Sequence, residues 1–104
     1  MDLQRGRRSF ARYVMGEWLP NHRMETNTRQ SYTGMIERYL LPEFGPMRMA
    51  EILPSHVRNF LSHLSGEGRS AGTVQRCRTV LSSIFTTALN DRVVFVHPCA
   101  AGGR

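Results

Sequence analysis

The sequence contains no lysine, because all 14 residues of the Lys and Arg group are arginine. Any mechanism that requires a lysine side chain is therefore excluded from this chain. Acidic residues are also few, with only 8 Asp and Glu, so the formal net charge is +6. An excess of positive charge favours a nucleic acid or an anionic membrane as the binding partner.

Long apolar runs are missing as well. No run reaches the roughly 18 apolar residues of a membrane-spanning helix, and the first residues lack the apolar core and cleavage site of a signal peptide. The two cysteines, Cys77 and Cys99, do not have the number or spacing of a disulfide framework or a metal site. We therefore expect a cytoplasmic protein in a reducing compartment, with no membrane segment.

The sequence also lacks the usual patterns of catalytic residues. His56 and His63 lie two helical turns apart, about 10 Å along an axis, which is too far to bind one metal ion together. Acidic pairs at helical spacing, a zinc-protease motif and a glycine-rich phosphate loop are all absent. Tyr13, Tyr32 and Tyr39 fall on apolar stripes and are predicted to be core residues. We expect no catalytic residue, no metal site and no cofactor.

Apolar residues recur every three or four positions in four segments, which predicts four helices. The length of 104 residues fits one small domain, so the predicted fold is a compact all-α four-helix bundle. The predicted helices run from a Ser9 cap to about Leu19, from a Thr26 or Asn27 cap to about Leu40, from Pro54 to about Ser65, and from a Ser70 cap to about Asn90. Prolines are expected to end the first helix at Pro20 and the second at Pro42.

We expect one domain over residues 9–98, between a flexible basic lead (1–8) and a linker (99–104). The core-facing positions of the domain follow from the apolar periodicity. The predicted core residues are Phe10, Tyr13, Val14, Trp18, Tyr32, Met35, Ile36, Tyr39, Val57, Phe60, Leu61, Leu64, Val74, Cys77, Leu81, Ile84, Phe85 and Ala88.

The fourth predicted helix has an unusual polar face. No carboxylate occurs from Gly68 to Asn90, and this stretch carries Arg69, Arg76 and Arg78 among serines and threonines. Solvated helix faces usually carry Glu with Lys or Arg pairs, whereas short hydroxyl side chains allow the backbone of a polyanion to approach. This pattern favours a nucleic-acid-facing helix. An ordinary surface helix in an Arg- and Ser-rich protein is the alternative.

Several short blocks occur in a characteristic order. They are Thr28-x-x-x-Tyr32, Leu41-Pro42-x-x-Gly45, Glu51-Ile52-x-Pro54, Ser70-x-x-Thr73-Val74, Leu81-Ser82-Ser83-Ile84-Phe85-x-x-Ala88, Asp91-Arg92 and His97-Pro98. In this order the chain from Phe10 to Ala100 resembles the core-binding domain of phage-type tyrosine recombinases. Two positions depart from the family pattern, since Leu53 replaces a Thr cap and His97 replaces an Asn.

The resemblance implies a SAM-like four-helix bundle that precedes a separate catalytic domain, with which it clamps double-stranded DNA at the core attachment site for DNA integration. It also implies a linker to the catalytic domain at residues 99–104. The tyrosine nucleophile and its partner residues match no position here. By analogy, the intact protein is expected to be a tetramer on DNA and this fragment a monomer.

In that family the starts of the second and fourth helices approach the major groove. The matching residues here have side chains suited to phosphate or base contact. The predicted DNA-binding residues are Asn27, Thr28, Arg29, Ser31, Arg69, Ser70, Thr73, Gln75, Arg76, Arg78 and Thr79.

Two other functions remain open. A stand-alone helix-turn-helix regulator could use the turn Gly66–Gly68 before the fourth helix. A SAM-like protein interaction module, which binds no nucleic acid, should display an exposed apolar patch, and the tail Val93–Val96 is the candidate.

Overall fold

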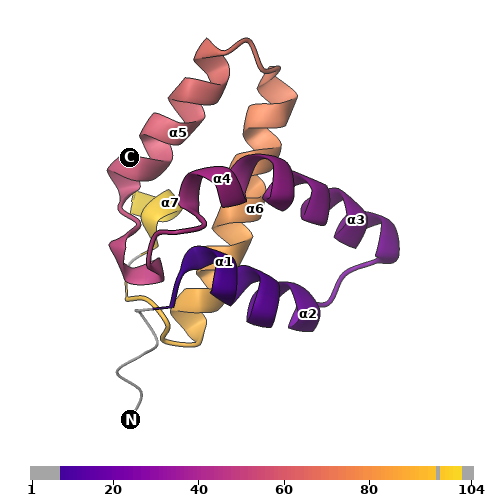
Figure 1. Ribbon diagram of the computed structural model, residues 1–104, viewed down its shortest axis with the longest axis vertical. Coiled ribbons are helices and arrows are strands. Elements are labelled where there is room, and N and C mark those ends of the chain that lie inside the picture. The colour runs from indigo at the N-terminus through magenta and orange to yellow at the C-terminus, as the bar shows by residue number, and fades with distance from the viewer. Residues whose placement is uncertain (1–7, 96, 102–104) are drawn as a thin grey trace.

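Four helical rods cross one another around a shared core (Figure 1). The computed structural model describes residues 8–95 and 97–101, and residues 1–7, 96 and 102–104 lie outside this part. The rods cover residues 10–21, residues 26–44, α5 (Pro54–Gly66) and α6 (Ala71–Asn90). A single turn, η4 (Met49–Glu51), and a short helix, α7 (Pro98–Ala101), complete the described part, which contains no strand. The predicted all-α four-helix fold is confirmed.

The first two rods each continue through a proline. Rod 10–21 consists of α1 (Phe10–Tyr13), the π-helical segment η2 (Val14–Trp18) and α2 (Leu19–Asn21). Rod 26–44 likewise consists of α3 (Thr26–Met35), the π-helical segment η3 (Ile36–Leu40) and α4 (Leu41–Phe44).

The prediction that Pro42 ends the second helix is therefore wrong, whereas the first helix ends at Asn21, one residue after Pro20. A π turn shifts the hydrogen bond from the fourth to the fifth preceding residue, as in Leu41 N–H to the Ile36 carbonyl. Each proline then lies in the first turn of a new α segment, where its missing N–H costs little.

Two predicted N-caps are confirmed. The Ser9 hydroxyl oxygen accepts from the Arg12 N–H at 3.1 Å, and the Ser70 hydroxyl oxygen accepts from the Thr73 N–H at 3.2 Å. Each contact satisfies one of the N–H groups that the first turn of a helix leaves without an intrahelical partner.

The other two helix starts differ from expectation. Neither Thr26 nor Asn27 caps α3, because the helix begins directly after Glu25, which has an extended backbone and no side-chain cap. At the start of α5, Leu53 offers no capping hydroxyl, but His56 Nδ1 accepts from the Leu53 N–H at 2.9 Å. The imidazole thus supplies one half of a capping box.

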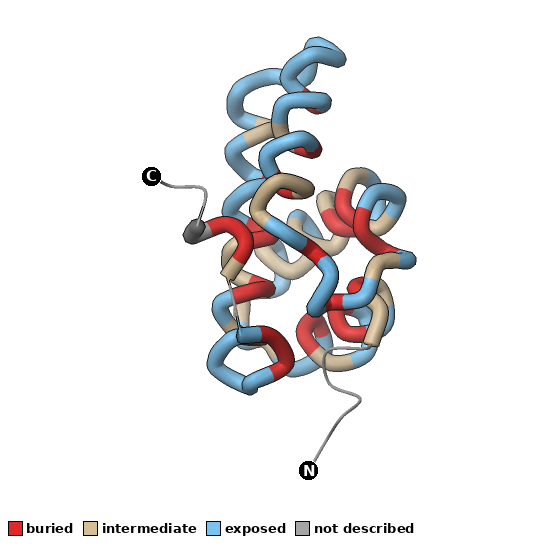
Figure 2. The backbone as a smooth tube through the Cα atoms, turned by 90° about the vertical axis from the view of Figure 1, so that its left-hand side faces the viewer, coloured by how far each residue is buried: buried red, intermediate tan, exposed pale blue. Residues whose placement is uncertain are grey.

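One phenylalanine from each rod meets at the centre of the core. The centroid of the Phe44 ring lies 5.8 Å from that of Phe10 and 5.1 Å from that of Phe60. The centroids of Phe10 and Phe85 lie 6.3 Å apart. Tilted and edge-on ring pairs at such distances are favourable. Figure 2 shows the buried segments facing inward, whereas the turn from α5 into α6 projects from the body and is exposed from residue 65 to 72.

Most predicted core positions are buried, and all exceptions but Leu61 lie on α3, η3 and α6, where these elements face one another. Tyr32, Met35, Tyr39, Leu61 and Val74 are only half-buried. Rod 26–44 instead buries Ile36, Leu40 and Phe44, because the rod continues past Pro42 with the same four-residue repeat. Val80 of α6 is also buried, although it was not among the predicted core residues.

The segment after α6 packs on the bundle. Val93 and Val94 are buried, whereas Phe95 is 81% exposed, and Val96 lies outside the described residues. Helix α7 packs against α5 and α6 and buries Cys99, so the packed chain extends beyond the point where we expected a linker. The predicted lead lies outside the described residues except for Arg8, which forms an ion pair with Glu17.

Helices α5 and α6 both end in a Schellman motif. After α5, the Arg69 N–H donates to the Leu64 carbonyl at 3.1 Å, and Gly68 has the left-handed φ of 87° that this motif requires. After α6, the Val93 N–H donates to the Ala88 carbonyl at 2.8 Å, but the left-handed residue is Arg92, with φ 61°.

Replacing Arg92 by glycine should stabilise the domain by about 1 kcal/mol, because glycine adopts a left-handed φ without the steric penalty of a Cβ atom. Urea unfolding followed by circular dichroism measures the change. The matched substitution Arg58→Gly, inside α5, should instead destabilise by about 1 kcal/mol. An Arg92→Gly variant less stable than wild type would contradict the assignment of strain to this residue.

Phe44→Ala should destabilise the domain by about 3–5 kcal/mol, since it removes a fully buried ring that contacts two other rods. Phe95→Ala provides the control, because this largely exposed ring should change stability by less than about 0.5 kcal/mol. The same unfolding experiment compares the two variants, and equal effects would show that Phe44 is not a core residue.

Candidate nucleic-acid interface

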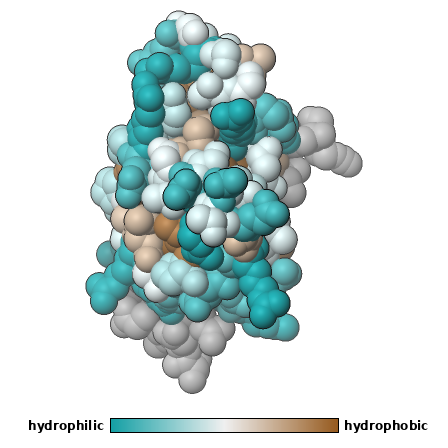
Figure 3. Space-filling view, turned by 90° about the vertical axis from the view of Figure 1, so that its right-hand side faces the viewer, coloured by the Kyte–Doolittle hydropathy of each residue, from teal (hydrophilic) through white to brown (hydrophobic). Residues whose placement is uncertain are grey.

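A groove of about 300 Å³ lies between α3 and α6. It is lined by Ser31, Tyr32, Met35, Gln75, Arg76, Thr79 and Val80. Four of the predicted DNA-binding residues, Ser31, Gln75, Arg76 and Thr79, therefore come together from two helices. Figure 3 shows the face on the α3 side of the molecule, where polar side chains surround a small apolar area.

Arg76 is the charged residue of this groove, and its side chain is exposed. Gln75 Nε2 lies 3.5 Å from the Thr79 hydroxyl, one turn further along α6, so the amide and hydroxyl form one polar strip. The half-buried Tyr32 and Met35 form the apolar wall of the groove. This wall explains why two predicted core residues of α3 retain exposure.

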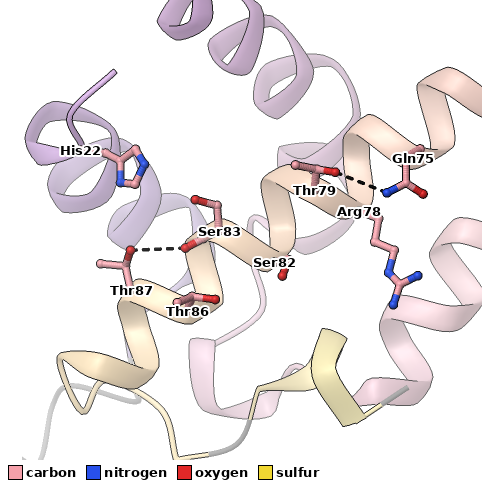
Figure 4. Close-up of a pocket in the computed structure, with 8 residues that line it drawn as sticks. All are labelled: His22, Gln75, Arg78, Thr79, Ser82, Ser83, Thr86 and Thr87. Carbon is pink, nitrogen blue, oxygen red and sulfur yellow. Dashed lines mark hydrogen bonds between the residues drawn. The ribbon is translucent and has the colours of Figure 1, made fainter. Parts of the chain in front are cut away.

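A second, larger groove of about 550 Å³ follows the acid-free side of α6 (Figure 4). It is lined by His22, Gln75, Arg78, Thr79, Ser82, Ser83, Thr86 and Thr87. Arg76 and Arg78 thus belong to different grooves, which Gln75 and Thr79 separate. His22 was not predicted, because only the folding of rod 10–21 onto α6 brings it near these hydroxyls.

The hydroxyl groups at the end of this groove also have intramolecular partners. Trp18 Nε1 donates to the Thr87 hydroxyl oxygen at 3.3 Å, and the Thr87 hydroxyl donates to the Ser83 carbonyl at 3.3 Å. His97 Nε2 lies 3.1 Å from the Thr86 hydroxyl. Thr86 and Thr87 are therefore already engaged in contacts within the domain.

The start of α6 holds three further predicted residues. The Ser70 hydroxyl caps the helix and lies 3.1 Å from the Thr73 hydroxyl, so both side chains help to form the helix start. Arg69 is exposed, and its guanidinium carbon lies 5.6 Å from the centroid of the Tyr39 ring. Because Gly68 sets the path of the chain here, Arg69 points back towards η3.

Arg29 has a structural role. Its guanidinium donates to the Leu19 carbonyl through Nη1 and to the His22 carbonyl, at 2.6 Å, through Nη2. These carbonyls lie at the carboxyl end of rod 10–21, where cations are favourable. The side chain is half-buried and already engaged, whereas Asn27 and Ser31 are exposed and Thr28 is half-buried. A DNA contact by Arg29 therefore remains only a prediction.

In the described residues, the pKa shifts of the buried tyrosine and cysteine side chains are all upward. Burial, reinforced by the charge of Asp91 and opposed by that of Arg8, raises the pKa of Tyr13 to about 12. Burial likewise raises the pKa of Cys77 to about 11. A nucleophile requires the opposite shift. No cluster of three potential metal ligands occurs in residues 8–95 and 97–101.

No helix in the described part of the chain combines the length and apolar character that crossing a membrane would need.

The arrangement of the helices is that of a SAM-like domain. The chain belongs to the family of phage integrase N-terminal SAM-like domains, whose family model matches residues 12–65. The predicted membership of the integrase family is therefore confirmed.

One relative and one solved structure are similar to this chain. The integrase of Mycobacterium phage L5 is 31% identical over 84 residues, which are 80% of this chain and 22% of the phage protein. The chain thus spans less than a quarter of that relative's length. The solution NMR structure of an integrase-like domain from Bacillus cereus superimposes with a TM-score of 0.85, covering 96% of this chain and 84% of that one. At 20% identity this second likeness shows the fold alone.

Arg29→Ala should destabilise the domain by about 1–3 kcal/mol, because the Leu19 and His22 carbonyls lose a charged donor. Chemical unfolding measures the loss. Arg23→Ala is the matched control, since Arg23 is an exposed arginine of the neighbouring loop and should change stability by less than about 0.5 kcal/mol. Equal stability of the two variants would show that the carbonyl contacts of Arg29 contribute nothing.

Proposed function

We propose that this domain binds double-stranded DNA as the core-binding part of a site-specific tyrosine recombinase. In this proposal the domain grips the duplex of the core attachment site, and a catalytic domain of the same protein carries out DNA integration or recombination. The observation that carries the proposal is the groove between α3 and α6, where Ser31, Gln75, Arg76 and Thr79 meet without a carboxylate. Membership of the integrase family supports it.

The geometry suits a duplex. An α-helix fits into the major groove of B-DNA, which is about 12 Å wide, and α6 is long enough to cross it. Arg76 has the donors to pair with a guanine or a phosphate, and Gln75 has the amide to pair with an adenine. Arg69 and Arg78 lie on either side and suit phosphate contacts, which orient a duplex without reading its sequence.

Hydroxyl groups complete the proposed interface. Ser31 and Thr79 extend from facing helices and are exposed. Ser70 and Thr73 are used for capping, yet a serine or threonine hydroxyl has more than one hydrogen-bonding site and can also contact a phosphate. The exposed Asn27 and half-buried Thr28, at the start of α3, form the outer margin of the same surface.

We propose that the domain itself catalyses no reaction and needs no metal or cofactor. Its partners would be duplex DNA and the catalytic domain of the same chain. The isolated domain would be a monomer, and the intact recombinase a tetramer assembled on DNA. The compartment would be the cytoplasm, where DNA is accessible.

DNA binding should be strongly salt-dependent. Three arginine–phosphate contacts predict a slope of log K against log salt concentration of about −3 between about 50 and 200 mM salt. Fluorescence anisotropy with two labelled duplexes of different sequence measures the slope, and the two duplexes should differ modestly in affinity. Binding that is unaffected by salt, or no binding to either duplex, would refute the proposal.

Arg76→Ala tests the groove in the same assay. Its slope should be shallower by about 1, and affinity should fall for both duplexes. Arg58→Ala is the matched control, since it removes one exposed arginine from the outer side of α5 and should retain most of the affinity. If both variants lose equal affinity, the binding depends on net charge and the groove has no special role.

A further inference from the structure

Two arginines lie against one tyrosine at the junction of η3 and α6. The guanidinium carbon of Arg38 lies 5.4 Å from the centroid of the Tyr39 ring, and that of Arg69 lies 5.6 Å from the same centroid. Both distances are within the range of a cation–π interaction. We refer to Arg38, Tyr39 and Arg69 as the arginine–tyrosine stack.

The stack lies at one end of the groove between α3 and α6. Ser31, Met35 and Tyr39 follow one another at four-residue spacing along rod 26–44, and the first two line the groove. On α6 the groove residues Thr79 and Arg76 lead back towards Arg69, which precedes the helix. Because η3 packs against α6, Tyr39 and Arg69 meet one turn beyond the groove.

The backbone holds Arg69 in this position. Gly68, with its φ of 87°, completes the Schellman motif that bonds the Arg69 N–H to the Leu64 carbonyl. The Tyr39 ring is half-buried and packs against the core. Both guanidinium groups therefore lie beside the same ring, and each arginine side chain is exposed.

No acidic side chain neutralises this pair. In residues 8–95 and 97–101, neither Arg38 nor Arg69 forms an ion pair with a carboxylate, although Glu37 and Glu67 are close in sequence. Glu67 instead pairs with His63, at 3.1 Å. Two like charges beside one ring repel each other, and the phosphate groups of a duplex would relieve the repulsion. Planar guanidinium groups are well suited to the oxygen atoms of a phosphate.

We propose that the arginine–tyrosine stack is a phosphate clamp, in which Arg38 and Arg69 each contact a phosphate of the backbone of the bound duplex. Tyr39 is a positioning residue, since its ring orients both guanidinium groups without contacting the ligand. The clamp rests on the proposed DNA-binding function. It extends the proposed interface beyond the groove to a further contact with the DNA backbone. From Arg69 to Thr79 the interface spans about 15 Å along α6, or about four base-pair steps.

Arg38→Ala tests the clamp by fluorescence anisotropy with the two duplexes described above. The dissociation constant should rise roughly eightfold at about 0.1 M salt, and the salt slope should become shallower by about 1. Because a phosphate carries no sequence information, the loss should be the same for both duplexes. Arg58→Ala is again the matched control, since it makes the same change in net charge.

Tyr39 is tested by a pair of variants. Tyr39→Phe keeps the ring and should bind as wild type does, whereas Tyr39→Leu removes the ring and should approach the affinity of Arg38→Ala. Thermal unfolding of each variant shows whether the fold is retained. If Tyr39→Leu does not fold, the comparison of Arg38→Ala with Arg58→Ala decides alone.

The outcomes separate the clamp from the function on which it rests. If wild type binds neither duplex, the proposed DNA-binding function and the clamp both fail. If wild type binds and Arg76→Ala weakens binding, but Arg38→Ala matches Arg58→Ala, only the clamp is refuted. A loss confined to one of the two duplexes would indicate base recognition by Arg38 and would also refute the phosphate clamp.

Discussion

The contact of Phe44 with Phe10 and Phe60 determines how the remaining helices can be arranged. Phe44 reaches the centre of the core only because rod 26–44 continues through Pro42, and the π-helical segment η3 makes this continuation possible. The rod consequently lies across α6 with α3 and η3 facing it. If the helix had ended at Leu40, α4 would not carry Phe44 into the core. The position of α3 on α6, and with it the groove, therefore depends on an apolar contact outside the groove.

Arginine, the only cationic residue type besides histidine, serves two different purposes in this domain. Arg29 donates to two backbone carbonyls at the end of rod 10–21 and joins this rod to α3. Arg38, Arg69 and Arg76 have no such acceptors in the described residues, and their charges remain available at or near the seam of α3 and α6. The same side chain thus stabilises the fold where it meets free carbonyls and provides positive potential where it does not. A count of arginines cannot distinguish these two roles, because the role depends on the acceptors nearby.

Local signals in the sequence predicted much of the fold. Apolar periodicity identified all four helices, and the caps at Ser9 and Ser70 are as predicted, because a helix start depends on a few consecutive residues. The continuation of the helices through Pro20 and Pro42 was not predictable in the same way. The π turn before each proline is less regular than an α turn, and it is maintained by the burial of residues that are distant in sequence. The same limit explains the absence of Arg38 and His22 from the predicted interface. Neither belongs to a predicted helix start. His22 lies beside the hydroxyls of α6 only through packing, and Arg38 lies at the Tyr39 ring that Arg69 also approaches.

The sequence by itself determined the helical fold class, the family and the acid-free polar face of α6, because these are properties of residue type and spacing along the chain. Only the tertiary structure decided which polar residues share a groove. Packing brought Ser31 to Gln75, Arg76 and Thr79, turned Arg29 towards the carbonyls of Leu19 and His22, and placed Arg38 and Arg69 on the ring of Tyr39. The physical reason is that burial of Phe44 and its partners sets the crossing of the rods, and the crossing sets the neighbours of every surface side chain at the seam.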